Sequence, residues 1–79
     1  MDMNQLRRLG EQIAATGVDA HAQELAWLAE AVIDRAPGTA SALVDTGATE
    51  VLRQRAFAVA TLVLERGVRR RRIAELVSA

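Results

Sequence analysis

Apolar side chains recur at spacings of three and four residues along most of this 79-residue chain, in segments separated by glycine or proline. This period matches one face of an α-helix, because residues three and four apart lie on the same side of a helix. The chain has no alternating run of β-branched residues of the kind that forms a half-buried strand. The sequence therefore predicts an all-α fold, a compact bundle of four to five short helices in a single domain, residues 1–79.

The helix ends are predicted from glycine, proline and capping residues. Asp2 and Asp19 stand just before the first two apolar segments and are of the type that caps helix N-termini. Glycine and proline end helices because they favour turns. The expected helices span residues 3–16, 20–36, 39–46, 48–66 and 68–78, with breaks at Gly17, Pro37-Gly38, Gly47 and Gly67. A fourth helix that continues through Gly67 also fits the sequence.

The fourth predicted helix is apolar on every side from Ala56 to Leu64. A helix with this pattern is expected to be buried all round. Because a domain of 79 residues has a small interior, we expect a second copy of the chain to cover part of this helix, with a dimer as the favoured assembly. The candidate self-interface residues are Phe57, Val59, Leu62, Val63 and, on the second helix, Trp27. Tryptophan is a common interface anchor when exposed, and Trp27 also fits a core position.

Four consecutive arginines, Arg69 to Arg72, follow Gly67-Val68. If a new helix starts at Gly67, the run falls in its first turn, where the positive end of the helix dipole disfavours cations. The arginines therefore require a negative partner, which would be phosphate, an acidic protein surface or the acidic half of another copy. The candidate contact residues are Arg66, Arg69, Arg70, Arg71 and Arg72. The apolar residues of the same segment are expected to face the bundle: Val68, Ile73, Leu76 and Val77.

Charge is segregated along the chain although the formal net charge is zero. Residues 1–47 carry seven acidic residues and three arginines, and residues 48–79 carry seven arginines and three acidic residues. The two parts therefore have net charges of −4 and +4. Such a distribution steers association, either with a second copy or with a charged partner.

The stretch from Leu62 to Leu76 resembles the first part of a helix-turn-helix, in which an apolar helix is followed by Gly-Val and then by a helix with an Ile-Ala pair. The resemblance covers 15 residues and implies nucleic-acid binding. A recognition helix would have to follow the Val77 region, and the sequence ends at Ala79. The arginines would then hold phosphates without reading bases. The low aromatic content leaves no base stacking to hold a single strand.

No catalytic or metal site is expected. Ser41 and Ser78 have no evident activating base, and no glycine-rich phosphate loop occurs. His21 and Glu24 share a helix face, but His21 is the only histidine and the order is the reverse of the Glu-x-x-His pattern of di-iron helices. The sequence therefore predicts a protein that is not an enzyme and uses no cofactor.

The sequence also predicts a cytoplasmic protein that does not enter a membrane. The longest uncharged apolar run, Ala56 to Leu64, is much shorter than the roughly 20 residues that span a bilayer. The N-terminal charges are not followed by the apolar stretch of a signal peptide. The absence of cysteine fits a reducing compartment.

These observations favour a small helical interaction module that self-associates and docks on a protein partner. The other hypothesis is a small DNA- or RNA-associated regulator that grips phosphates with its arginine-rich C-terminal helix.

Overall fold

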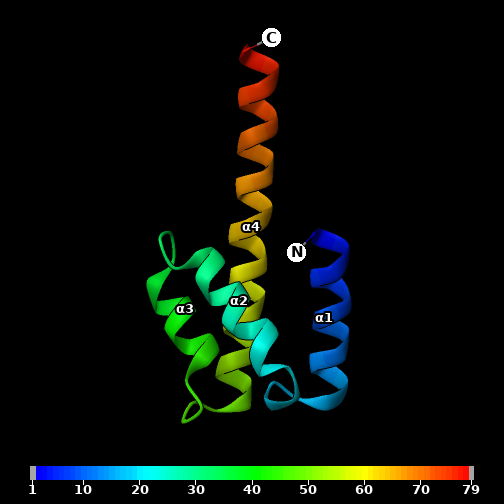
Figure 1. Cartoon of the computed structure of the whole chain (residues 1–79), viewed down its shortest axis with the longest axis vertical. Helices are drawn as coiled ribbons and strands as arrows, with labels where there is room; N and C mark the ends of the chain where they lie inside the picture. The colour runs from blue at the N-terminus through cyan, green and yellow to red at the C-terminus, as the bar shows by residue number, and fades with distance from the viewer. Residues whose placement is uncertain (1, 79) are drawn as a thin grey trace.

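The computed structural model describes residues 2–78, which form four α-helices and one short 3-10 helix (Figure 1). The elements are α1 (Met3–Thr16), η1 (Asp19–His21), α2 (Ala22–Val32), α3 (Pro37–Val44) and α4 (Glu50–Ser78). α4 is the long axis of the molecule, with α1 on one side of its lower half and the α2–α3 pair on the other (Figure 1). The predicted all-α bundle is confirmed, and no strand occurs among the described residues.

α1 begins and ends where the sequence predicts. The Asp2 carboxylate accepts a hydrogen bond from Gln5 N at 2.8 Å, and the Gln5 side chain accepts one from Asp2 N at 2.7 Å. This reciprocal capping box satisfies backbone N–H groups that the helix leaves free at its start. Gly17 ends the helix with φ of 86°, a conformation that side-chain-bearing residues rarely adopt.

The second and third helices are offset from their predicted ends. α2 stops at Val32 instead of residue 36, and a turn follows at residues 33–35. α3 spans 37–44 instead of 39–46 because Pro37 occupies its first turn, where a missing N–H costs nothing. Proline also disfavours helical geometry in the residue before it, and Ala36 accordingly lies outside the helical region, with φ of −141° and ψ of 69°.

The core lies where all four helices meet, and the fully buried apolar side chains that α4 contributes to it are small. Ala56 and Ala60 are the buried apolar residues of α4. Alanine on this face lets the neighbouring helices approach α4 closely. The larger buried residues come from the shorter elements: Leu6, Leu9, Ile13, Val18, Leu25, Leu28, Val32 and Leu43.

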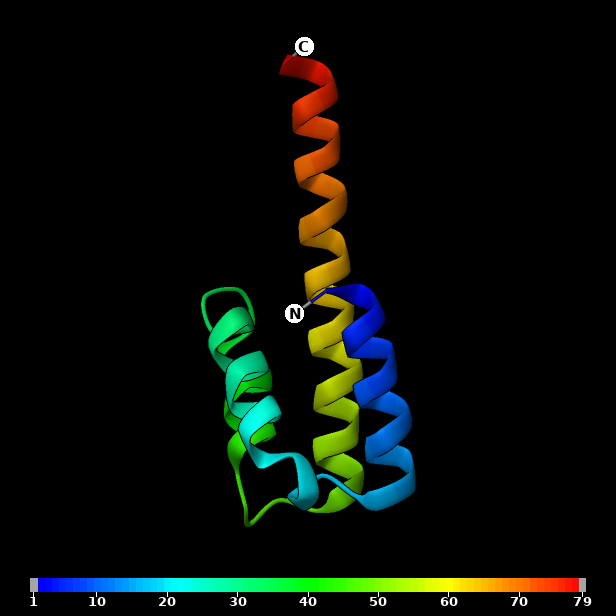
Figure 2. The same cartoon turned by 45° about the vertical axis from the view of Figure 1, so that its right-hand side comes forward.

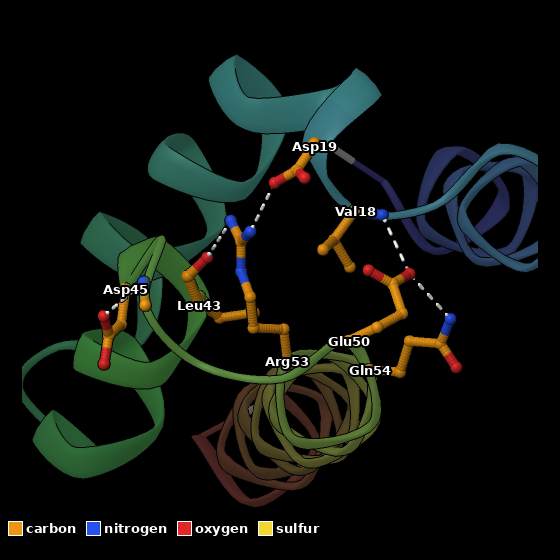
Figure 3. Close-up of polar contacts among 8 residues, drawn as sticks. Val18, Asp19, Leu43, Asp45, Glu50, Arg53 and Gln54 are labelled. Carbon is orange, nitrogen blue, oxygen red and sulfur yellow. Dashed lines mark hydrogen bonds and ion pairs between the residues drawn. The ribbon is translucent and has the colours of Figure 1, made fainter.

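Polar contacts hold the start of α4 to η1, to the residue before η1 and to the end of α3 (Figure 3). The buried guanidinium of Arg53 donates to the Asp19 carboxylate at 2.8 Å and to the Leu43 carbonyl oxygen at 3.1 Å. Glu50 accepts a hydrogen bond from Val18 N at 3.0 Å. The prediction that Asp19 caps the second helix is wrong, since its carboxylate pairs with Arg53 and the residue before α2 is His21, which makes no capping bond.

The predicted break at Gly67 is also wrong. α4 runs without interruption for 29 residues, so the helices predicted over 48–66 and 68–78 are one. A glycine inside a helix costs only about 1 kcal/mol relative to alanine. Extending a formed helix needs no new nucleus, so this cost does not stop it. The turn that a helix-turn-helix requires at Gly67-Val68 is therefore absent.

Candidate interaction surface

α4 has a packed part and a projecting part. It packs against the bundle as far as Gly67, which is buried, whereas every residue from Arg69 to Val77 is exposed. Figures 1 and 2 both show this upper part of the helix standing clear of the other elements. Residues 68–78 are called the projecting segment below.

The sequence-based prediction that the apolar side chains of the projecting segment face the bundle is wrong. Ile73, Leu76 and Val77 are 61 %, 79 % and 82 % exposed, and Val68 is only half-buried. The reason is geometric: α1, α2 and α3 are all shorter than α4, so nothing beside the projecting segment is available to cover it (Figure 2).

The position of the arginine run within the helix also corrects the sequence-based expectation. Arg69 to Arg72 lie in the second half of α4 and not in the first turn of a new helix. The nearer end of the helix dipole is then the negative one, which favours cations. The dipole therefore does not oppose the run, and the cost of placing it here comes from repulsion between the arginines themselves.

The projecting arginines have no acidic partner within the described residues, where the ion pair found is that of Arg53 with Asp19. Arg66 stands three and four residues before Arg69 and Arg70, and Arg69 stands three before Arg72. Like charges at these spacings repel on a helix surface. An acidic or phosphorylated partner would relieve this repulsion.

Large apolar side chains follow the solvent-facing side of α4 at heptad spacing. Every seventh residue from position 52 is large and apolar except one: the series is Leu52, Val59, Arg66 and Ile73. A second series with the same spacing starts three residues later and alternates between arginine and leucine: Arg55, Leu62, Arg69 and Leu76. We call Leu52, Val59, Leu62, Ile73 and Leu76 the apolar seam. They are 44–79 % exposed, and this pattern is typical of a helix that pairs with another helix.

The candidate self-interface residues do not share one surface. Val59 and Leu62 belong to the apolar seam, whereas Phe57 and Val63 are partly buried against the core. The expected all-round burial of residues 56–64 is therefore wrong, because Val59 and Leu62 are 44 % and 51 % exposed.

Trp27 is 55 % exposed, so the interpretation of this residue as part of the core is wrong. It adjoins a hollow shared with Leu28, Ala31 and Leu64, and a second one toward α1. Leu64, which shares the hollow with Trp27, and Leu62, which belongs to the apolar seam, project about 200° apart around the axis of α4. Trp27 therefore lies on the opposite side of α4 from the apolar seam.

Arg35 is a residue near this surface that sequence reasoning missed. It lies in the turn after α2, and its Nη1 lies 2.6 Å from the point where a Cβ on Gly67 would stand. The Arg35 guanidinium therefore lies against the backbone of α4 at Gly67. A mid-helix glycine was the available signal, but in the sequence alone it reads as a helix end.

Residues 2–78 offer no arrangement that holds a metal, since no three His, Asp or Glu side chains gather in this part of the chain. His21 Nε2 lies 2.9 Å from the Thr16 hydroxyl. Among the described residues, no helix has the length and apolar character needed to cross a membrane.

Comparison with known protein families, curated proteins and solved structures gives no match to this chain.

Proposed function

We propose that this protein is a small non-enzymatic interaction module that self-associates through the apolar seam of α4 and docks on an acidic protein surface through its projecting arginines. The observation that carries the proposal is the seam itself: five large apolar side chains in heptad register, each of them 44–79 % exposed. Covering such a row with a second helix removes apolar area from water at about 25 cal/mol per Å².

A second copy of the chain is the partner that we propose for the seam. Two copies present the same heptad spacing, so the side chains of one seam fit between those of the other. Arginines at three of the heptad places, Arg55, Arg66 and Arg69, interrupt the row. Polar residues in a helix seam lower the stability of pairing but restrict its register.

The arginines on the remaining surface of the projecting segment support a docking role for it. They stand away from the acidic first half of the same chain, and within the described residues none of them is ion-paired. A protein partner with an acidic surface would complement them, and rim charges of this kind mainly raise the rate of association.

The test is the solution mass by light scattering on a sizing column, at low and high salt, for the wild type and for Ile73→Glu and Leu62→Glu. We expect a wild-type dimer that survives high salt, because apolar contacts respond weakly to screening. Both variants should elute as monomers, since each places a carboxylate in the seam without disturbing a buried residue.

Ala74→Glu is the matched control for Ile73→Glu. It introduces the same charge one residue later, about 100° around the helix and outside the seam. It should leave the dimer intact. A wild type that is monomeric at both salt concentrations would contradict self-association. If Ile73→Glu and Ala74→Glu change the solution mass equally, the dimer does not form through the apolar seam.

The nucleic-acid hypothesis makes a different prediction in the same salt series. If the arginines contact phosphates, the logarithm of the binding constant for DNA should fall with the logarithm of the salt concentration, with a slope of about one per contacted phosphate. Arg70→Glu combined with Arg71→Glu would then abolish binding without unfolding the chain, since both side chains are exposed. Steep, arginine-dependent DNA binding by a monomer would replace the proposal above.

A further inference from the structure

Three arginines from two parts of the chain meet around Gly67. Arg66 and Arg70 lie one turn apart on α4, and Arg35 reaches them from the turn that follows α2. Together with Val63 they line a hollow of about 330 Å³ on the surface. We call Arg35, Arg66 and Arg70 the arginine cradle.

We infer that the arginine cradle is a binding site for a phosphate monoester group. The inference is testable apart from the self-association and the partner proposed above, because the cradle is formed within one chain, although Arg66 also holds a heptad place in the seam.

Gly67 is what brings Arg35 into the cradle. A Cβ at this position would stand 2.6 Å from Arg35 Nη1, closer than non-bonded atoms approach. Because Gly67 has no side chain, the Arg35 guanidinium occupies the space beside its backbone. Gly67 is buried although it directly precedes the projecting segment. A Cβ at this position would therefore force the Arg35 guanidinium to move from the place that it occupies here.

A fourth arginine, Arg71, contacts the Gly67 backbone, although it does not line the hollow. Arg71 Nε donates to the carbonyl oxygen of Gly67 at 3.4 Å. This bond keeps another positive charge on the same turn of α4.

The cradle has the charge of an anion site. Its three arginines line one hollow although like charges repel, and within the described residues none of them pairs with a carboxylate. Guanidinium groups match phosphate oxygens with two parallel hydrogen bonds. A monoester dianion presents three oxygens and nearly two charges, whereas a side-chain carboxylate or a phosphodiester presents one charge. Three arginines that line one hollow therefore favour the monoester.

The experiment is a titration of the ¹⁵N-labelled full chain with inorganic phosphate, followed by NMR. We expect saturable shifts centred on the Gly67 amide and on the Arg35 side chain. Arg35→Ala and Arg70→Ala should each weaken binding about tenfold, the usual effect of losing a charge-assisted hydrogen bond.

Arg69→Ala is the matched control for Arg70→Ala. It removes the same charge from the same run, but Arg69 does not line the hollow. Its affinity for phosphate should stay within about twofold of the wild type, since screening weakens distant surface charges. Equal weakening by the two substitutions would mean diffuse attraction and would overturn the site.

Gly67→Ala separates binding from folding. The added methyl group should displace Arg35 and weaken phosphate binding, while the chain stays as stable as the wild type or becomes more stable, because alanine favours helix. Gly38→Ala is its control: Gly38 also lies in a helix, nothing stands within 4 Å of its added Cβ, and binding should not change. Unchanged phosphate binding in Gly67→Ala would contradict the role of Arg35.

A second titration distinguishes the sources of the phosphate group. A peptide with one phosphoserine that binds more tightly than inorganic phosphate, with the same sensitivity to Arg35→Ala, would identify a phosphorylated protein as the ligand. Equal or weaker binding of the peptide would identify a small phosphorylated molecule. Failure of both probes to bind would overturn the inference while leaving the seam and its dimer test unaffected.

Discussion

The two parts of α4 show how one helix can serve two purposes. Up to Gly67 the helix faces the bundle with Ala56 and Ala60, both nearly inaccessible, and its start is fixed by Arg53 and Glu50. Beyond Gly67 no other helix lies beside it (Figure 1). This part exposes arginines beside large apolar residues. The packed part is held by the rest of the domain, whereas the projecting segment is helical because it extends a helix that is already formed.

This difference explains why the projecting segment is available for binding. Most of the stability of a protein helix comes from tertiary packing of one face, and the projecting segment has little of it. Changes there should therefore alter binding and leave folding nearly untouched. Changes in the bundle should do the reverse.

The largest contrast is expected from one substitution made in each region. Leu25→Ala removes a side chain with no exposed surface and should lower the free energy of unfolding by about 2–5 kcal/mol. Leu76→Ala, at a position 79 % exposed, should change it by less than about 0.5 kcal/mol. Urea denaturation at concentrations where the chain is monomeric measures both. Comparable losses would show that the projecting segment is packed in solution.

A smaller contrast is expected between a buried and an exposed arginine. Arg53→Met leaves the Leu43 carbonyl oxygen without its guanidinium donor, and also removes a buried charge whose Nε has no partner within the described residues. These effects oppose each other, so the expected loss is about 1 kcal/mol. Arg72→Met should change the free energy of unfolding by less than about 0.5 kcal/mol. The same urea titrations check this pair. If Arg53→Met raises the free energy of unfolding, burial of the charge destabilises the fold by more than its hydrogen bonds stabilise it.

The sequence was sufficient to predict the helical class and the first helix, because both depend on local signals. The apolar period marks α1, and Asp2, Gln5 and Gly17 mark its ends. The start of α4 is predicted to within two residues: the helix begins at Glu50 instead of residue 48, and the Thr49 hydroxyl accepts a hydrogen bond from Leu52 N as a capping residue does.

The features that were missed depend on contacts between distant residues. Asp19 is suited to cap a helix, but Arg53 lies 34 positions later and pairs with its carboxylate. Gly67 marks a helix end in local terms, whereas in the fold it makes room for Arg35. The heptad spacing of the apolar seam was visible in the sequence, but assigning a break at Gly67 divided the seam between two helices and concealed its register.

The continuity of α4 through Gly67 is the central claim, because the seam and the arginine cradle both depend on it. Its most direct test is the Cα secondary chemical shifts from Val63 to Leu76 in the monomeric Leu62→Glu chain. An unbroken helix predicts positive helical shifts at every residue, including Gly67 and Val68. Shifts near random-coil values at Gly67 and its neighbours would show a turn there, and would contradict both the seam and the cradle.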